Sequence, residues 1–187
     1  MTGPGKLIYV VGPSGAGKDA LLEHARANLP ADTKVTFARR WITRSADAGG
    51  EAHRALTSAE FERKLRLGAF AMHWRAHGNG YGIDAEIGDW LRSGATVVVS
   101  GSRAHLPQAL KDFPGLHVIH VSADPAVLRE RLLHRGRETA AQIDERLARA
   151  ARYALPQGAR VTEVRNDRRL EDGEADMLAA IRNIDCG

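Results

Sequence analysis

The residues of the chain that most clearly indicate chemistry are Gly12, Gly17 and Lys18, which have the spacing G-x-x-x-x-G-K. A continuous apolar run over 7–11 precedes them, and a helical pattern over 18–28 follows. In this context the glycines let backbone N–H groups face phosphate oxygens, and the helix N-terminus adds the positive end of its dipole. The lysine then reaches the phosphoryl group that is transferred. We therefore expect a nucleotide's phosphates to contact Gly12, Pro13, Ser14, Gly15, Ala16, Gly17 and Lys18.

Asp19 stands where this motif normally has a serine or threonine, whose hydroxyl binds Mg²⁺. The next residue, Ala20, has no hydroxyl either, and the apolar run over 95–99 ends in Ser100, without an acidic ligand. A carboxylate is a hard oxygen ligand, so we predict that Asp19 holds Mg²⁺ directly or through water. The alternative is that Asp19 only interacts favourably with the first turn of the helix. ATP and Mg²⁺ are the expected cofactors.

Apolar runs that alternate with helical patterns surround this loop and predict a parallel sheet with helices on both faces. We expect strands over 7–11, 35–37, 70–74, 95–99, 116–121 and 160–164. We expect helices over 18–28, 57–67, 85–91, 104–113, 125–135, 139–153 and 175–184. Residues 39–55 are rich in arginine, glycine and small side chains and are expected to form an exposed loop, and 78–82 a turn. The length of 187 residues fits one α/β domain.

The composition is ordinary for a globular protein, with 43% hydrophobic residues, 27% charged residues and a net charge of +4. Cys186 is the single cysteine, so no disulfide within the chain is possible and a reducing, cytoplasmic location is expected. No signal-peptide pattern and no apolar run long enough to span a bilayer is present. Basic residues form no stripe interleaved with aromatic residues, so we expect neither a nucleic acid nor a membrane as partner. A homodimer is left open.

Several longer segments resemble the ribose 1,5-bisphosphate phosphokinase family of the phosphonate-degradation pathway. They are residues 40–44, 51–53, 100–109, 135–138 and 146–153. The phosphate loop, with residues 42–44, 50–51, 81–82 and 166–167, also resembles guanylate kinases. The resemblance implies a three-layer α/β, guanylate kinase-like P-loop NTPase fold with a mostly parallel central sheet, in one domain over 1–187. It places the core at 1–37 and 95–187, an acceptor-binding insertion at 38–84 and a lid at 133–142.

The resemblance also implies an activity, the transfer of the ATP γ-phosphoryl group to the 1-phosphate of ribose 1,5-bisphosphate. The products would be 5-phosphoribosyl 1-diphosphate (PRPP) and ADP, and the partner a small phosphorylated sugar. The chain departs from guanylate kinases where they recognise guanine, because Trp74 and its neighbours replace a glutamate, and Ser100 and Ser102 an aspartate. Leaving guanine's N–H donors unpaired costs about 1–3 kcal/mol each. A nucleoside monophosphate kinase with altered base preference and a binding module without catalysis stay open, although Gly17 and Lys18 are retained.

On the acceptor side, the resemblance places arginines and hydroxyl-bearing residues opposite the phosphate loop. They are Arg39, Arg40, Thr43, Arg44, Tyr81, Ser102 and Arg103, with Glu51 and His53 as contacts for the sugar hydroxyls. Arginine binds phosphate through two parallel hydrogen bonds. Because a phosphate monoester is already ionised near neutral pH, no general base is needed, and catalysis depends on positioning and charge neutralisation. The alternative is that these side chains are solvated surface charges.

On the nucleotide side, Arg135 and Arg137 lie between two predicted helices, at the place of the mobile lid of nucleotide monophosphate kinases. We expect them to close over ATP, exclude water and stabilise the transferred charge, with Arg146 contacting the γ-phosphoryl group. Arg149 follows on the same helix face and is expected to bind substrate, whereas Asn166 is expected near the adenine. A basic hairpin in solvent is the alternative for the four arginines. The predicted catalytic residues are thus Lys18, Arg135, Arg137 and Arg146.

Overall fold

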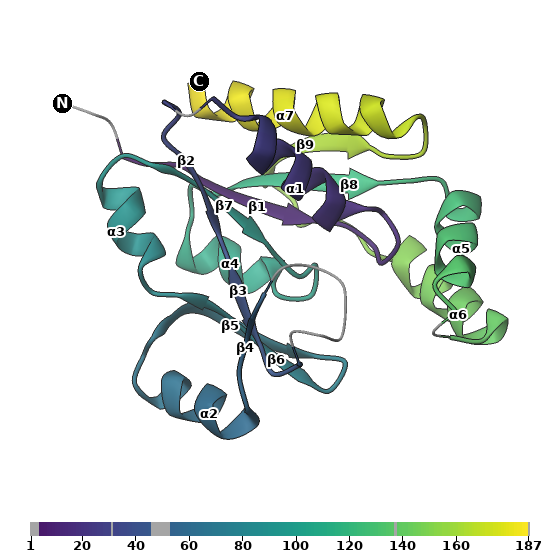
Figure 1. Ribbon diagram of the computed structural model, residues 1–187, viewed down its shortest axis with the longest axis horizontal. Coiled ribbons are helices and arrows are strands. Elements are labelled where there is room, and N and C mark those ends of the chain that lie inside the picture. The colour runs from purple at the N-terminus through teal and green to yellow at the C-terminus, as the bar shows by residue number, and fades with distance from the viewer. Residues whose placement is uncertain (1–3, 31, 46–52, 137, 187) are drawn as a thin grey trace.

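The centre of the protein is a five-stranded sheet in the order β2-β7-β1-β8-β9, in which all neighbouring strands are parallel. The computed structural model describes residues 4–30, 32–45, 53–136 and 138–186. The strands of this sheet are β1 (Leu7–Val11), β2 (Val35–Ala38), β7 (Thr96–Ser100), β8 (His117–Ser122) and β9 (Arg160–Arg165). The strand that leads into the phosphate loop, β1, is therefore the central one (Figure 1). The predicted parallel sheet is confirmed.

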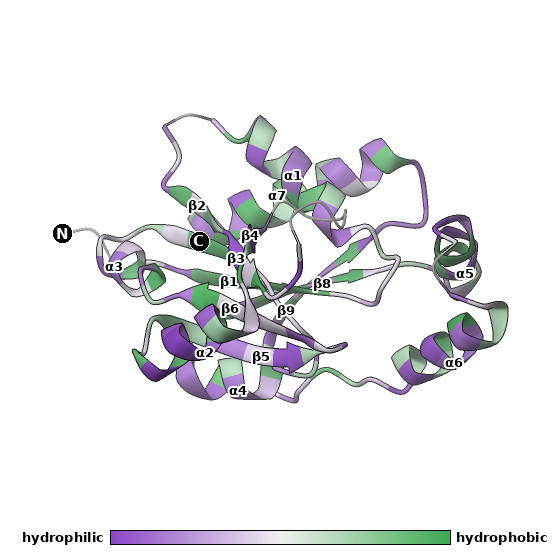
Figure 2. Cartoon of the chain, turned by 60° about the horizontal axis from the view of Figure 1, so that its bottom comes forward, coloured by the Kyte–Doolittle hydropathy of each residue, from purple (hydrophilic) through white to green (hydrophobic). Residues whose placement is uncertain are grey.

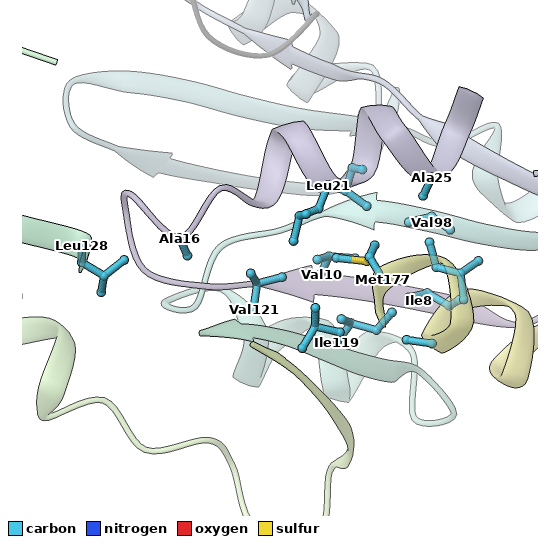
Figure 3. Packing of buried hydrophobic residues seen from close by; sticks show 14 residues of the cluster. Ile8, Val10, Ala16, Leu21, Ala25, Val98, Ile119, Val121, Leu128 and Met177 are labelled. Carbon is cyan, nitrogen blue, oxygen red and sulfur yellow. The ribbon is translucent and has the colours of Figure 1, made fainter. Parts of the chain in front are cut away.

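Helices cover both faces of this sheet, and as a result every side chain of β1 is buried. The helices of the chain are α1 (Lys18–Asn28), α2 (Ser58–Arg66), α3 (Ile87–Arg92), α4 (Leu106–Asp112), α5 (Pro125–His134), α6 (Ala140–Ala151) and α7 (Leu170–Cys186). On one face, Ile8 and Val10 pack in a cluster with Leu21 of α1 and Met177 of α7 (Figure 3). On the other face, Tyr9 is buried among residues of α3 and α4. The result is the expected three-layer architecture.

Helices α5 and α6 form a hairpin beyond the carboxyl ends of the strands (Figure 1). Thr139 begins α6 with a capping box, and Ile143 is fully buried. Arg129 of α5 donates to Asp144 of α6 at 2.7 Å. Apolar and polar stretches both occur along α6 (Figure 2), as expected for a helix with one packed face. In the part of the chain that the structure describes, no helix is long and apolar enough to cross a membrane.

A second, four-stranded sheet has the order β4-β3-β6-β5 and carries α2. Its strands are β3 (Arg40–Ile42), β4 (Arg54–Ala55), β5 (Phe70–Ala76) and β6 (Asn79–Asp84). A capping box begins α2, because Thr57 accepts from the amide of Glu60, whose side chain in turn accepts from the amide of Thr57. Phe61 of α2 is buried with its ring centroid 5.2 Å from that of Phe70. This contact attaches the helix to the sheet.

The structure corrects the prediction of an exposed loop over 39–55 and of a turn over 78–82. Residues 40–42 and 54–55 form β3 and β4, because β3 pairs with 81–83 of β6. The turn lies instead at His77-Gly78, where both residues have the positive φ that a tight hairpin requires. Inside β6 the ring of Phe70 lies so close that a Cβ on Gly82 would come within 2.4 Å of it. Glycine in this segment thus permits close packing. In addition, α7 begins at Leu170 rather than at 175.

Candidate active site

The phosphate loop has the alternating backbone of an anion-binding nest. Gly15 and Gly17 have φ values of 90° and 82°, in the left-handed region that favours glycine. The amide of Ala16 donates to the carbonyl of Pro13 at 3.2 Å and closes the turn. Helix α1 then begins at Lys18, so its unpaired N-terminal amides and the nest share one side of the loop. This local geometry fits the phosphates of a nucleotide.

Two side chains from distant parts of the chain hold the loop from behind. Asn166, at the end of β9, is 2% exposed, and its Nδ2 donates to the carbonyl of Ala16 at 2.8 Å. Arg131 of α5 donates from Nη1 to the carbonyl of Gly15 at 3.3 Å. We expected Asn166 near the adenine of the nucleotide. In the structure it lies beneath the loop and does not line the cavity described below. Sequence reasoning missed Arg131, although its place one helical turn before Arg135 indicates a shared face.

Lys18 contacts the two oxygen-bearing side chains nearest to the loop. Its Nζ lies 2.8 Å from Asp19 Oδ1 and donates to Ser100 Oγ at 2.7 Å. Ser100 ends β7 and is 9% exposed. Its Oγ donates to Asp19 Oδ1 at 3.5 Å. Arg40 of the second sheet approaches the same carboxylate oxygen at 3.8 Å. One carboxylate therefore interacts with the phosphate-loop lysine and with an arginine of the acceptor region.

A cavity of about 990 Å³ lies between the phosphate loop, the second sheet, the β7–α4 loop and the α5–α6 hairpin. Most of the predicted site residues line it, namely Gly12, Pro13, Ser14, Gly15, Gly17, Lys18, Asp19, Arg40, Arg44, Tyr81, Ser102, Arg103, Arg135, Arg146 and Arg149. Ala16 is fully buried behind the loop. Arg39 lines a smaller cavity of about 420 Å³ beside α1. Glu51 and Arg137 lie outside the described residues.

Thr43 and His53, both expected to contact substrate, stabilise the backbone around Arg44. Thr43 Oγ1 accepts from the amide of Gly80 at 2.8 Å. His53 Nε2 lies 3.1 Å from the carbonyl of Arg44. The Nε of Arg44 is itself buried and meets no partner among the described residues. Because a buried guanidinium N–H without a partner is costly, Arg44 is well placed to donate to an anion in the cavity.

Aromatic side chains form a stack at the base of the acceptor region, which sequence analysis did not predict. The rings of Trp74 and Tyr81 are parallel, with centroids 5.5 Å apart. On one side His105 stacks on Trp74 at 5.2 Å, and on the other Arg40 lies 5.7 Å from the centre of the Tyr81 ring. The stack thus joins Arg40, Tyr81 and Trp74 of the second sheet to His105 at the start of α4.

The β7–α4 loop is tied to the core and to α6. The hydroxyl of Tyr9 accepts from the amide of Ser102 at 3.0 Å, and burial raises the pKa of Tyr9 to about 12, so it stays protonated. A Cβ on Gly101 would come within 2.1 Å of the Tyr9 ring, so the backbone approaches this ring closely. Arg103 donates to the carbonyl of Ala150 at 3.4 Å, and Tyr153 donates to the carbonyl of Arg103 at 3.0 Å. Burial lowers the pKa of Arg103.

The α5–α6 hairpin brings further arginines to the opposite wall of the cavity. Arg146 donates to Ser14 Oγ at 3.3 Å and pairs with Glu138 at 2.8 Å. Arg149 is largely exposed and lies 4.0 Å from Glu145. Arg135 lines the cavity from the end of α5. The hairpin therefore presents positive charge toward the phosphate loop.

The lining of the cavity fits ATP with Mg²⁺ and an anionic acceptor. Among the described residues, Asp19 and Glu138 are the acidic ones that line it. No group of three or more His, Cys, Asp or Glu that could hold a metal ion occurs in the described part of the chain. A Mg²⁺ ion bound at Asp19 would therefore take its remaining ligands from phosphates, hydroxyls and water, as is usual for this ion at nucleotide sites.

Fold and site together define the class, a P-loop kinase of the guanylate kinase-like type. Guanylate kinase from Anaplasma phagocytophilum has the same fold, with a TM-score of 0.69 and 16% identity, over 98% of this chain and 88% of that one. A gluconokinase from Sinorhizobium meliloti 1021 matches with a TM-score of 0.50 and 23% identity, over 97% and 93% of the two chains. These similarities concern the fold alone and confirm the predicted fold class.

Closer relatives define the family. Ribose 1,5-bisphosphate phosphokinase PhnN from Burkholderia pseudomallei (strain K96243) is 48% identical over 179 residues, 96% of each chain. The enzyme of that name from Thiobacillus denitrificans is 50% identical over 181 residues, 97% of this chain and 95% of that one. The one from Desulfomicrobium baculatum is 52% identical over 145 residues, 78% of each chain. No family model matches the chain. The chain belongs to the ribose 1,5-bisphosphate phosphokinase family, as the resemblance predicts.

Proposed function

We propose that the protein transfers the γ-phosphoryl group of ATP to the 1-phosphate of ribose 1,5-bisphosphate, giving 5-phosphoribosyl 1-diphosphate and ADP. The observation that carries this proposal is the charge of the acceptor half of the cavity. Arg40, Arg44 and Arg103 line it, and the acidic residues among the described lining residues, Asp19 and Glu138, belong to α1 and to the α5–α6 connection rather than to the second sheet or the β7–α4 loop. Such a wall attracts a sugar with two phosphates and lacks the acceptors that a guanine base needs. The names of the relatives agree with this substrate.

The chemistry needs little from the protein beyond placement and charge. An oxygen of the acceptor's 1-phosphate attacks the γ-phosphorus, and the bond from that phosphorus to the bridging oxygen of ADP breaks. This nucleophile is ionised near neutral pH, so no proton has to be removed and no general base is required. Two anions must approach each other, and the arginines of both walls offset their repulsion. Bound Mg²⁺ neutralises charge on the nucleotide's phosphates.

Each group of residues has its own task in this proposal. The phosphate loop and Lys18 hold the β- and γ-phosphates, and Asp19 holds Mg²⁺. Arg135 and Arg146, with Arg137 from outside the described residues, neutralise the transferred group. The acceptor is held by Arg40, Arg44, Tyr81, Ser102, Arg103 and Arg149, with Glu51 near its hydroxyls. The reaction takes place in the cytoplasm and involves neither a nucleic acid nor a membrane.

The test is an assay of ADP release by the purified protein with Mg²⁺-ATP and either ribose 1,5-bisphosphate or GMP. We expect turnover with the bisphosphate, a ³¹P spectrum of a diphosphate on the product, and little turnover with GMP. Lys18→Ala serves as the inactive control, and Lys34→Ala, at an exposed position before β2, as the matched active control. Turnover of GMP without turnover of the bisphosphate would overturn the proposal.

A further inference from the structure

The hydroxyl and the carboxylate beside the phosphate loop have exchanged places relative to the usual arrangement in P-loop NTPases. In P-loop NTPases a hydroxyl follows the loop lysine, and an aspartate comes from a strand beside the loop strand. Here the carboxylate, Asp19, follows the lysine. The hydroxyl, Ser100, ends β7, which is parallel to β1 and pairs Ser100 with Val10. The chain therefore has one hydroxyl and one carboxylate at this place, each in the other's position.

The hydroxyl of Ser100 and the carboxylate of Asp19 lie close together beside the ammonium group of Lys18. Ser100 Oγ and Asp19 Oδ1 are 3.5 Å apart, and both contact Lys18 Nζ, at 2.7 and 2.8 Å. Ser100 is 9% exposed, so its hydroxyl is surrounded mainly by protein atoms rather than by solvent. Both residues also line the smaller cavity beside α1. Oxygens this close, of the hard type that Mg²⁺ prefers, can serve one ion directly or through one water.

We propose that Ser100 is the second protein group of the Mg²⁺ site, acting together with Asp19. This inference rests on the proposed use of Mg²⁺-ATP and adds the residue that completes the protein's part of the metal site. The competing interpretation is that Ser100 only accepts the hydrogen bond of Lys18. The two differ in one respect: a metal-site residue changes the strength and selectivity of metal binding, whereas a partner of the lysine changes nucleotide binding whichever metal is present.

The first experiment measures binding of Mn²⁺ to the protein with a non-hydrolysable ATP analogue, by calorimetry and by the electron paramagnetic resonance of Mn²⁺. Ser100→Ala should weaken Mn²⁺ binding about tenfold, the lower end for loss of a group supporting a metal site. Binding of the analogue without metal should stay within about twofold, since the loop is unchanged. Ser122→Ala is the matched control, because Ser122 ends β8, the neighbour of β1 on its other side.

Two further variants test direct participation. Ser100→Cys should shift the preference from Mg²⁺ toward Cd²⁺ by about tenfold or more, because a thiolate selects softer metals. Ser122→Cys should not. The double exchange Asp19→Ser with Ser100→Asp restores the usual order of ligands, and should bind Mn²⁺ about tenfold more tightly than Asp19→Ser alone. Circular dichroism and the unfolding midpoint verify that each variant is folded.

The outcomes separate this inference from the proposed function. Equal loss of analogue binding with and without metal in Ser100→Ala, no shift toward Cd²⁺ in Ser100→Cys, or no recovery in the double exchange would each overturn it. These measurements use no acceptor. Failure to turn over ribose 1,5-bisphosphate would therefore remove the proposed substrate and leave the metal site standing. Absence of any metal-dependent nucleotide binding in the unaltered protein would remove both.

Discussion

The nucleotide half of the cavity is built mainly from backbone, whereas the acceptor half is built from side chains. The phosphate loop is one continuous segment between β1 and α1, and its carbonyls accept hydrogen bonds from the buried Asn166 and the half-buried Arg131. The acceptor half includes two very short strands, with three residues in β3 and two in β4, and arginines and a ring stack line its surface. The comparison implies that changes in the first half impair nucleotide binding or catalysis, and that changes in the second raise KM for the acceptor.

The strongest test of the nucleotide half is Lys18→Ala. Removing the ammonium group from the transferred phosphoryl group should lower kcat/KM about a thousandfold, as for other preorganised charges at a transition state. The unfolding midpoint should change little, since the Lys18 side chain contributes to the site rather than to the core. Steady-state kinetics of ADP release measure the effect. A loss of less than tenfold in kcat/KM would contradict the proposed contact of Lys18 with the transferred phosphoryl group.

Arg44→Ala tests the acceptor half. A hydrogen bond to a charged group contributes about 1.5–3 kcal/mol, so KM for the acceptor should rise roughly 10- to 150-fold. KM for ATP should stay constant, and Arg44→Lys should recover part of the loss, because it restores charge without the two-pronged contact. Arg63→Ala, exposed on α2, is the control. Equal changes in both KM values would show that the two halves are not separate.

Asn166→Leu tests whether the loop depends on its buried support. Loss of the donor leaves the carbonyl of Ala16 without its partner, so the free energy of unfolding should fall by about 1–3 kcal/mol. Affinity for an ATP analogue should fall too, while KM for the acceptor should not change. Urea unfolding and calorimetry give the two numbers. Asn28→Ala is the control, since its amide bonds a carbonyl on the exposed side of α1.

Tyr153→Phe should have the smallest effect. It removes the hydroxyl that donates to the carbonyl of Arg103 and retains the ring under the guanidinium. A hydrogen bond of this kind contributes about 0.5–1.5 kcal/mol, so KM for the acceptor should rise roughly two- to tenfold. If KM for ATP rises instead, Arg103 belongs to the nucleotide half, and the division between the halves must be redrawn.

The central sheet and its helices could be predicted from the sequence because their patterns are local. Helix α1 has the predicted bounds, and the capping box at Thr57 marks the start of α2. The small sheet could not be predicted in the same way. Its strand β3 pairs with β6, about forty residues further along, and the glycines in β6 resemble a turn in the sequence, whereas in the structure Gly80 packs against the ring of Phe61 and Gly82 against that of Phe70.

The site shows the same division. Lys18 and the loop residues of the motif, apart from the buried Ala16, line the cavity, and their contact with a nucleotide stays a prediction. For Asn166 and Thr43 the residue types were compatible with substrate contacts, but their side chains bond the backbone instead. The direction of a side chain depends on strand register and on neighbouring elements, which a single sequence does not specify. The stack of Trp74 on Tyr81 was missed for the same reason.

The close approach of Gly101 to Tyr9 restricts the order in which these two positions can be substituted during evolution. Because the ring fills the space of any side chain at 101, a larger residue there is excluded while the tyrosine is present. If position 9 first becomes small, the vacated volume can accept a methyl group at 101. The reverse order passes through an ancestor whose core is disrupted. The two positions can therefore diverge only in one sequence of steps, and a reconstructed lineage should retain that order.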